Sequence, residues 1–484
     1  MATTRYLGRI HHPAIGVRIP EIFLEGILNA CVKRNTATGL MLSFGRETAP
    51  QAVIDAPPGQ YEITLGHTGT SIRQYQTMCA EAAADKGVVV EIEADHLIII
   101  GSATRAVQRI AGVHLDTHIS EAELEKSLAY NRMAIEEAVS TGRVNFFTTD
   151  TSDLFRPGVD HLGEADLTAL FEKAFPAAER AALMDRYLGQ TFSFATVDGV
   201  PFEISFDRQD VMRLATKYER SITINARLYR EIADLLGRPF GFEISLDETP
   251  EETQEKDFLW YLLEWKRRGL PCDYVAPNIG FHKRADYEGD REALRRKVAR
   301  LHAMALGVSG TLLSFHSGSG STPYSGKGPG TYEALLAATG SRLKYKISGV
   351  YYELLMELMA SQPAGTHPRQ LYETIFTDVR DYVREVLRQN LPLASDLLRQ
   401  QMEQYEREVA AGRDPFDPRH DFFRFYSYLA LALRDDQNRR KHRIALVELM
   451  EKDREFAQRF HEECEALTLR LIDGLHFENN LEEG

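Results

Sequence analysis

Four short apolar segments of this 484-residue chain end in histidine or acidic side chains, which can bind metals or transfer protons. The first, Val88–His96, runs through valine and isoleucine directly into Asp95 and His96. A carboxylate and an imidazole between two apolar runs are costly to bury without partners. The pair could be bonded to loop backbone, or it could join a metal ligand to an acid or base.

The second segment, Gly241–Glu248, carries polar residues on one face of a predicted strand. Side chains alternate along a strand, so Glu243, Ser245 and Asp247 share a face. Strands buried on both faces are usually apolar throughout, so this polar face favours a functional site. Glu243 is the better catalytic candidate, whereas Asp247 and Glu248 could instead cap a helix or support the site.

The other two segments deliver histidines from strand ends. Asp273–His282 places His282 in a short loop, where an ordinary surface histidine is the equal alternative. Thr311–Gly320 passes from apolar residues into His316 and is followed by a glycine-rich stretch. Because glycine lets the backbone approach a ligand closely, this last pattern favours a site.

Other polar residues could line a substrate pocket near these segments. Lys344 and Lys346 share one face of a predicted strand, where one of them could meet a substrate carboxylate or hydroxyl. Surface exposure is the alternative. The candidate substrate-binding residues are His67, Thr70, Ser317, Ser319, Lys344 and Lys346.

Histidines from three separate strand ends could form an open metal site. We expect His96, His282 and His316 to hold one divalent cation, for which zinc, manganese, nickel and cobalt are all candidates. Asp95 and Glu243 would then be free for proton transfer. No HExxH motif occurs, which excludes a zincin.

Two glycine-containing segments look like nucleotide-binding loops but lack the required spacing. In Ser325–Thr331, glycine follows Lys327 where a P-loop needs serine or threonine. Gly66–Thr70 lacks the G-x-G-x-x-G spacing of a dinucleotide site. We therefore expect neither Walker-type NTPase activity nor a nicotinamide cofactor.

Short strand patterns alternate with amphipathic helical patterns from about residue 36 to residue 350. This alternation predicts parallel strands with helices packed outside. About eight strands over this length predict an α/β fold, a (β/α)8 barrel of the TIM type, whose active groups lie at the carboxyl ends of the strands. The predicted strands are Leu40–Phe44, Tyr61–Leu65, Val88–Ala94, Val144–Thr149, Gly241–Leu246, Asp273–Ala276, Thr311–Phe315 and Leu343–Ile347.

An insertion and a helical extension accompany the predicted barrel. Ser193–Asp207 has strand patterns on both sides of a glycine- and proline-containing turn, which predicts a β-hairpin at about residues 191–210. Beyond residue 350 only helical patterns continue, separated by short turns. The predicted domains are a catalytic barrel with insertions at 1–350 and a helical extension packed on it at 351–484.

Composition narrows the function class. Apolar residues make up 43% of the chain and charged residues 26%, as in ordinary globular proteins, and the net charge of −14 disfavours nucleic-acid binding. The four cysteines form no CxxC pair, the N-terminus has no apolar signal region, and no apolar run approaches the ~20 residues of a membrane helix. We expect a cytoplasmic protein without nucleic-acid or membrane partners, and a homo-oligomer stays open.

The strand-end motifs resemble those of the tagaturonate/fructuronate epimerases, whose members have a similar chain length. The resemblance spans most of the barrel and extends to FFRFYSYLALALRD in the helical part. In that family an Asp-Lys pair usually follows HSGS, whereas Gly320 and Ser321 follow it here, so the preference for a carboxylate could differ. The motifs that carry the resemblance are EADH (Glu93–His96), FEISLDE (Phe242–Glu248), APNIGFHKRADYEGD (Ala276–Asp290) and HSGS (His316–Ser319).

The resemblance implies a metal-dependent epimerase that interconverts tagaturonate and fructuronate, or the ketohexoses tagatose and fructose. The positions carried over are Asp95, His96, Glu243, His282 and His316. The inverted carbon bears a C–H that is β to the ketone, so enolisation cannot acidify it. We expect retro-aldol cleavage and re-addition, with Asp95 as base and Glu243 as acid, an order that stays open.

Two other functions remain as alternatives. A metal-dependent aldolase or sugar isomerase on the same barrel would need almost the same site residues. A non-catalytic sugar-binding or scaffold protein is the alternative of another class, although an inactive barrel could replace its polar strand ends with apolar residues.

Overall fold

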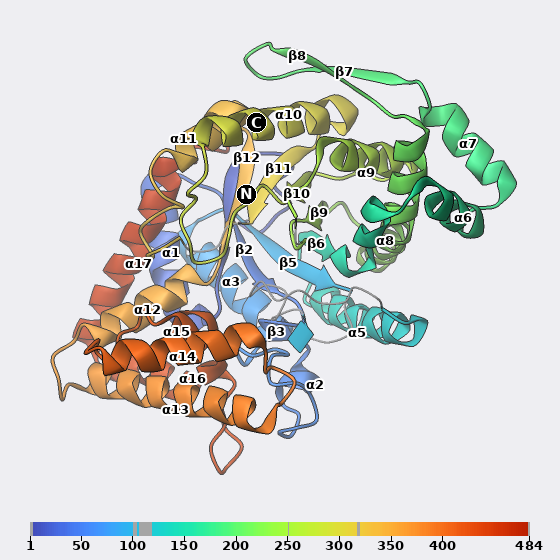
Figure 1. Cartoon of the computed structure of the whole chain (residues 1–484). Helices are drawn as coiled ribbons and strands as arrows, with labels where there is room; N and C mark the ends of the chain where they lie inside the picture. Colours follow the sequence, from blue (N-terminus) through green and yellow to red (C-terminus); the bar gives the residue numbers. More distant parts are fainter. Residues whose placement is uncertain (1–2, 100–103, 106–118, 250, 317–319, 483–484) are drawn as a thin grey trace.

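Eight parallel strands close into a barrel at the centre of the computed structural model (Figure 1). The structure describes residues 3–99, 104–105, 119–249, 251–316 and 320–482. Around the barrel the strand order is β1-β12-β11-β10-β9-β6-β5-β2. In chain order the barrel strands are β1 (His12–Gly16), β2 (Thr38–Ser43), β5 (Val90–Ile98), β6 (Phe146–Asp150), β9 (Gly241–Leu246), β10 (Tyr274–Pro277), β11 (Leu312–His316) and β12 (Leu343–Ile347).

Seven of the eight predicted strands are barrel strands, and one prediction is wrong. Tyr61–Leu65 lies in turns and bends, and Tyr61 is exposed. The eighth strand is β1, which pairs in parallel with both β12 and β2 and so closes the barrel. Its sequence, HPAIG, opens with histidine and proline, so it lacks the apolar run by which the other strands could be recognised.

Helices cover the outside of the barrel. Their ends follow local rules, as α8 illustrates: Asp207 accepts a hydrogen bond from the backbone N–H of Asp210, whose carboxylate accepts one in return, and Gly237 ends the helix at φ 63°. The helices that surround the barrel are α1 (Pro20–Arg34), α3 (Ile72–Lys86), α5 (Glu121–Ser140), α8 (Arg208–Leu236), α9 (Glu255–Arg267), α10 (Arg291–Ser309) and α11 (Thr331–Thr339).

An arm of helices and a hairpin is inserted between β6 and α8. The hairpin pairs β7 (Thr191–Ala195) with β8 (Pro201–Ser205) in antiparallel register, as the sequence predicts. It follows the short helices η1 (Ser152–Leu154), η2 (Pro157–His161), α6 (Glu164–Ala174) and α7 (Ala177–Tyr187). The segment between β2 and α3 holds α2 (Gln51–Ile54) and a small sheet of β3 (Thr48–Ala49) and β4 (Thr70–Ser71).

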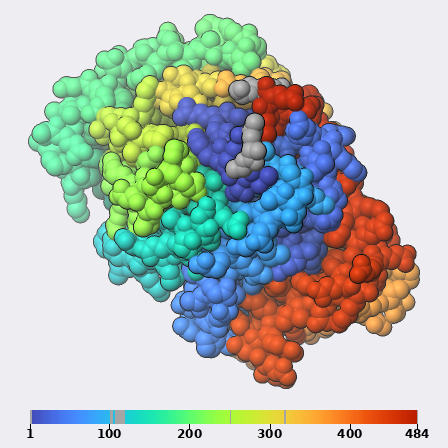
Figure 2. Space-filling view, turned by 180° about the vertical axis from the view of Figure 1, so that it is seen from behind, coloured from blue at the N-terminus to red at the C-terminus, as the bar shows by residue number. Residues whose placement is uncertain are grey.

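The residues after β12 form a helical extension that packs against the barrel, with α17 lying along α1 (Figure 1). Figure 2 shows the hairpin arm and this extension at opposite ends of the molecule. Among the described residues, every helix is too short or too polar to span a lipid bilayer. The extension comprises α12 (Val350–Ala360), α13 (His367–Gln389), α14 (Asp396–Ala410), α15 (Asp421–Tyr426), η3 (Ser427–Leu431), α16 (Lys441–Lys452) and α17 (Arg454–Gly474).

The interior of the barrel contains charged side chains. Lys344 Nζ lies 2.8 Å from Glu93 Oε2, and neither side chain is exposed to solvent. A Cβ atom at Gly39 would lie 1.9 Å from Glu93 Oε1, so this glycine makes room for the carboxylate. Buried charges persist only when they are paired. The pair fills the barrel directly beneath the polar strand ends.

Candidate active site

A β-bulge in β5 presents Asp95 and His96. The pairing of β5 with β6 shifts between Ala94 and Leu97, so Asp95 and His96 together lie opposite Thr148. His96 adopts φ 46°, in the left-handed region, which costs a non-glycine residue roughly 1–2 kcal/mol. Such backbone strain is commonly retained at functional sites. The bulge turns two successive polar side chains toward the end of the barrel.

Strand β9 and the loop after it bring two carboxylates to His316, the last residue of β11. His316 Nε2 donates to Glu243 Oε1 at 2.6 Å, and its Nδ1 lies 3.3 Å from Asp247 Oδ1. The second contact lacks hydrogen-bond geometry, so Nδ1 has no hydrogen-bond partner among the described residues. Both carboxylates reach one ring because Glu243 and Asp247 stand four residues apart, on the same face.

His96 is held in the same manner as His316. Its Nδ1 donates to Asp95 Oδ2 at 2.9 Å, while its Nε2 lies 3.9 Å from Glu248 Oε1. The centroids of the His96 and His316 rings are 4.9 Å apart. A carboxylate that accepts from one imidazole nitrogen fixes the tautomer and leaves the lone pair of the other nitrogen available to a metal.

The available nitrogens and the adjacent carboxylates fit a divalent cation. Ligand atoms of His96, Asp247 and His316 lie within 4.8 Å of one another, and His96, Asp150 and Glu248 form a second such group. Zinc, manganese, nickel and cobalt all accept mixed imidazole and carboxylate ligands. The buried Nδ1 of His316, which lacks a hydrogen-bond partner among the residues the structure describes, is the atom that a cation would satisfy.

Lys346 joins the two carboxylates that the sequence nominates for catalysis. Its ammonium donates to Asp95 Oδ1 at 2.7 Å and to Thr148 Oγ1 at 2.6 Å, and it lies 2.9 Å from Glu243 Oε1. The Lys346 side chain is only 3% exposed, so these contacts are made away from bulk water. The site is therefore a connected network of two histidines, their carboxylates and one lysine.

This network keeps its carboxylates ionised. Burial by itself would raise the pKa of Asp95, but the charges of His96 and Lys346 outweigh burial and hold that pKa well below its usual range. Burial likewise opposes ionisation of Glu243, and Lys346, Lys344 and His316 together hold its pKa well below the ordinary value. Neither carboxyl group therefore carries a proton at neutral pH.

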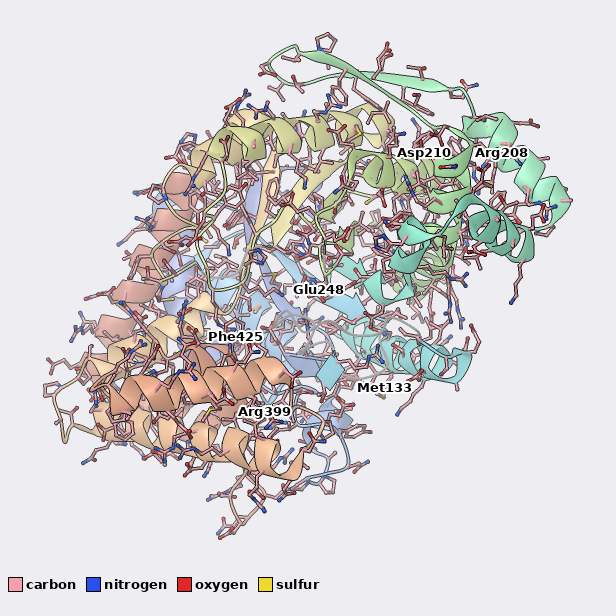
Figure 3. The ribbon with its side chains drawn as sticks, in the orientation of Figure 1. Met133, Arg208, Asp210, Glu248, Arg399 and Phe425 are labelled. Carbon is pink, nitrogen blue, oxygen red and sulfur yellow. The ribbon has the colours of Figure 1, made fainter. Side chains whose placement is uncertain are left out.

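A cavity of about 170 Å³ opens beside the histidines. The barrel contributes its polar strand ends, and the helical extension contributes aromatic side chains. Figure 3 shows the region where the two parts meet, with Phe425 from α15 and Glu248 from the loop after β9. The basic residues in the cavity wall are Arg18, Arg46, Lys283, Arg284 and Lys346, and the aromatic residues are Phe425, Tyr426 and Tyr428.

The predicted substrate-binding residues lie in different surroundings. His67 and Lys346 line the cavity, and the ring centroid of His67 is 4.4 Å from that of Tyr428. Lys344 lies below the site and binds Glu93 inside the barrel. Thr70 is outside the cavity wall and donates its hydroxyl hydrogen to the carbonyl of Arg18. Two further predicted residues, Ser317 and Ser319, lie outside the described part of the chain.

His282 is not brought to the pair formed by His96 and His316. Its side chain is exposed on the loop after β10, and its carbonyl accepts a hydrogen bond from the ammonium of Lys327. Among the described residues, His282 is absent from both groups that could hold a metal. The histidine marks a loop near the site, but the residues of that loop that line the cavity are its neighbours Lys283 and Arg284.

Several site residues are missing from the sequence-based set. Asp150 ends β6, so the strand-end pattern that identifies Asp95 could also have identified it. Asp247 appears there only as a helix cap or supporting residue, although it lies beside His316. Arg18 follows strand β1, which the sequence does not reveal. The aromatic residues of the extension lie far from the barrel in sequence, so no local pattern links them to the site.

Comparison with known proteins agrees with the site motifs. Residues 130–384, more than half of the chain, match the sequence model of the family UxaE, tagaturonate epimerase. The tagaturonate/fructuronate epimerase of Thermotoga maritima is 29% identical over 269 residues, which cover 54% of this chain and 50% of that protein. The match therefore spans half the length of this curated relative.

Solved structures match the fold of nearly the whole chain. The fructuronate-tagaturonate epimerase UxaE from Cohnella laeviribosi, in complex with one glycerol, aligns with a TM-score of 0.65 and 19% identity. Its native structure gives the same TM-score at 18% identity, and each alignment covers 98% of this chain and 83% of the other. At this identity the likeness concerns the fold, whereas the family assignment comes from the sequence match. The chain belongs to the tagaturonate epimerase family.

Proposed function

We propose that the protein is a metal-dependent epimerase that interconverts tagaturonate and fructuronate. The observation that carries this proposal is the pair of imidazoles, His96 and His316, each bound to a carboxylate on one nitrogen and directed toward Asp247 by the other. They lie at the carboxyl ends of barrel strands, where enzymes of this fold place their chemistry. Family membership supports the substrate class.

His96, His316 and Asp247 are the proposed metal ligands, with Asp150 and Glu248 adjacent. A divalent cation bound there would polarise the substrate ketone and stabilise developing negative charge by several kcal/mol. Asp95 and Glu243 each fix one imidazole ring and its tautomer, and Glu243 acts only in this way. In this proposal His282 is not a ligand.

The reaction must invert a carbinol carbon that is β to the ketone, so we propose retro-aldol chemistry. Removal of the hydroxyl proton breaks the bond between the carbinol carbon and its α neighbour, and the bonding electrons pass to the carbonyl side. The resulting aldehyde turns its other face to the nucleophilic carbon, the bond re-forms, and the proton returns to the oxygen. Atoms and electrons balance without an external oxidant.

Asp95 is the proposed proton acceptor and donor in these steps. It lines the cavity and is ionised, so it can take a hydroxyl proton and later return it. Lys346 also lines the cavity, and its ammonium can stabilise the substrate alkoxide. Glu243 is fully buried and is not part of the cavity wall, so we assign it the positioning of His316 and Lys346 rather than the role of acid.

Turnover with defined metals tests this proposal. The purified protein would be stripped with a chelator and reloaded separately with zinc, manganese, nickel and cobalt. We expect interconversion of fructuronate and tagaturonate to disappear on stripping and to return with at least one metal. Full turnover by metal-free protein, or no interconversion with any metal, would contradict the proposal.

The same assay separates an epimerase from an aldolase on this barrel. An aldolase would release a three-carbon aldehyde in proportion to substrate consumed, whereas an epimerase retains its fragments and accumulates the epimer. Including fructose and tagatose as substrates measures how far activity depends on the carboxylate. Release of the aldehyde as the main product would favour the aldolase function.

A further inference from the structure

Apart from the metal-binding group, the cavity wall is rich in positively charged side chains. Arg284, on the loop after β10, is half-buried in this wall and stacks on Phe425, with its guanidinium carbon 4.6 Å from the ring centroid. The backbone carbonyl of Arg284 accepts a hydrogen bond from Arg424, and the Arg284 side chain forms none with the described residues. Its guanidinium lines the cavity and forms no ion pair with a carboxylate in the part of the chain that the structure describes.

The carboxylates near Arg284 form their ion pairs with other arginines. Glu353 pairs through Oε1 with Arg424 Nε at 2.6 Å, and its other oxygen, Oε2, is buried without a hydrogen-bond partner among the described residues. Glu47 lies 2.7 Å from Arg18 Nε and also accepts hydrogen bonds from the backbone N–H of Ser43 and the hydroxyl of Ser348, each at 3.0 Å. The wall thus holds two guanidinium groups: Arg18 pairs with Glu47, whereas Arg284 forms no ion pair within 4.0 Å among the described residues.

The electrostatics of Arg284 reflect this imbalance. The pKa of Arg284 is lowered to about 10, chiefly by burial; the charge of Glu353 opposes this shift, and the charges of Arg18 and Arg424 add to it. Like charges held together in a half-buried wall repel one another, and an anion placed between them removes that repulsion. The wall is therefore suited to a negatively charged ligand group.

Tyr428 adds a hydroxyl to the same wall. The residue is 6% exposed and lines the cavity, and its hydroxyl has no hydrogen-bond partner among the described residues. A phenol can donate to a carboxylate oxygen, and a guanidinium offers paired donors in the geometry of a carboxylate. Phe425 fixes the plane of that guanidinium by stacking.

We propose that Arg284, supported by Arg18 and Tyr428, forms the subsite that binds the carboxylate of a sugar acid. This inference rests on the proposed epimerase function and explains why the enzyme would prefer a sugar acid to a neutral sugar. The ketone end of the substrate lies at His96 and His316, and the carboxylate end lies at the cationic wall. The helical extension thereby contributes to substrate specificity, through Phe425 and Tyr428.

The test compares a charged sugar with a neutral one in wild-type protein and in Arg284→Gln. Binding of fructuronate and of fructose would be measured by calorimetry on the metal-loaded protein, and kcat/KM for both would be measured in parallel. Because hydrogen bonds to charged groups are the strong ones, we expect about a 10- to 100-fold loss of fructuronate affinity. Fructose affinity should change by less than about threefold, within the range of surface substitutions.

Two further variants control for damage to the fold. Arg296→Gln removes an exposed guanidinium on α10 and should leave both affinities unchanged. Tyr428→Phe removes only the hydroxyl and should weaken fructuronate binding by about 3- to 10-fold, with fructose unaffected. Equal losses for both sugars in Arg284→Gln, or an unchanged fructuronate affinity, would overturn the subsite. Wild-type protein that binds fructuronate without turning it over would instead contradict the proposed function, while the binding comparison would still decide the subsite.

Discussion

Two imidazoles with carboxylates behind them are the chemical centre of this molecule. Asp95 binds one nitrogen of His96 and Glu243 binds one nitrogen of His316, so each ring offers its other nitrogen to the same small volume. Lys346 then links the two carboxylates. A histidine so supported is a stronger and better-oriented ligand than an isolated one, because its tautomer and ring plane are fixed.

Glu243→Gln tests this arrangement at the scale of one residue. The amide keeps the shape of the side chain but removes the charge that supports His316 and Lys346. We expect metal affinity to fall by about 10- to 100-fold, the usual cost of losing such a supporting group. Titration of the metal-free protein with zinc, in competition with a chelator, measures the change.

The matched control for this variant is Glu203→Gln on the exposed face of the hairpin strand β8. It removes the same charge far from the barrel end and should leave zinc affinity within error of wild type. An unaltered affinity in Glu243→Gln, at equal helical content, would remove Glu243 from the metal site.

Packing between α1 and α17 fixes the helical extension to the barrel. A Cβ atom at Gly26 would lie 2.6 Å from the carbonyl oxygen of His461 and 2.7 Å from Cys464 Cβ. The two helices therefore approach each other as closely as they do because position 26 has no side chain. The cavity depends on this contact, because Phe425 and Tyr428 belong to the extension.

Gly26→Ala should destabilise the protein, although alanine normally stabilises a helix interior. The helix propensity gain is about 1 kcal/mol, but the added methyl must push α17 away, and overpacking costs about 1–3 kcal/mol. We expect a net loss of unfolding free energy in denaturant titrations. Gly158→Ala, where a Cβ meets nothing within 4 Å, should be near neutral. A Gly26→Ala protein more stable than wild type would mean that this contact does not hold the extension.

The sequence identifies elements better than it identifies spatial neighbours. Seven barrel strands carry apolar runs of the right length, whereas β1 opens with histidine and proline and Tyr61–Leu65 imitates a strand in a segment of turns and bends. His96, His316 and Glu243 are recognisable because each is a polar residue within or at the end of a buried strand. His282 follows a buried strand by several residues, and the loop between them carries its side chain to the surface.

At the scale of the whole molecule, the site is built from parts far apart in the chain. The barrel supplies the metal-binding group, the β1 and β10 loops supply Arg18 and Arg284, and residues beyond 420 supply the aromatic wall. No local pattern could join these parts, because only the closed barrel and the packed extension bring them together. The hairpin arm lies at the end of the molecule opposite the helical extension (Figure 2). It contributes none of the described residues that line the cavity.

X-ray absorption spectroscopy of the metal-loaded protein, backed by an anomalous difference map from its crystals, tests the account most directly. We expect one divalent cation bound by His96 Nε2, His316 Nδ1 and the Asp247 carboxylate, at the roughly 2.0–2.2 Å typical of such ligands. The signal of two imidazoles should fall to one in His96→Ala. A cation bound by His282, or a spectrum without imidazole ligands, would contradict the account.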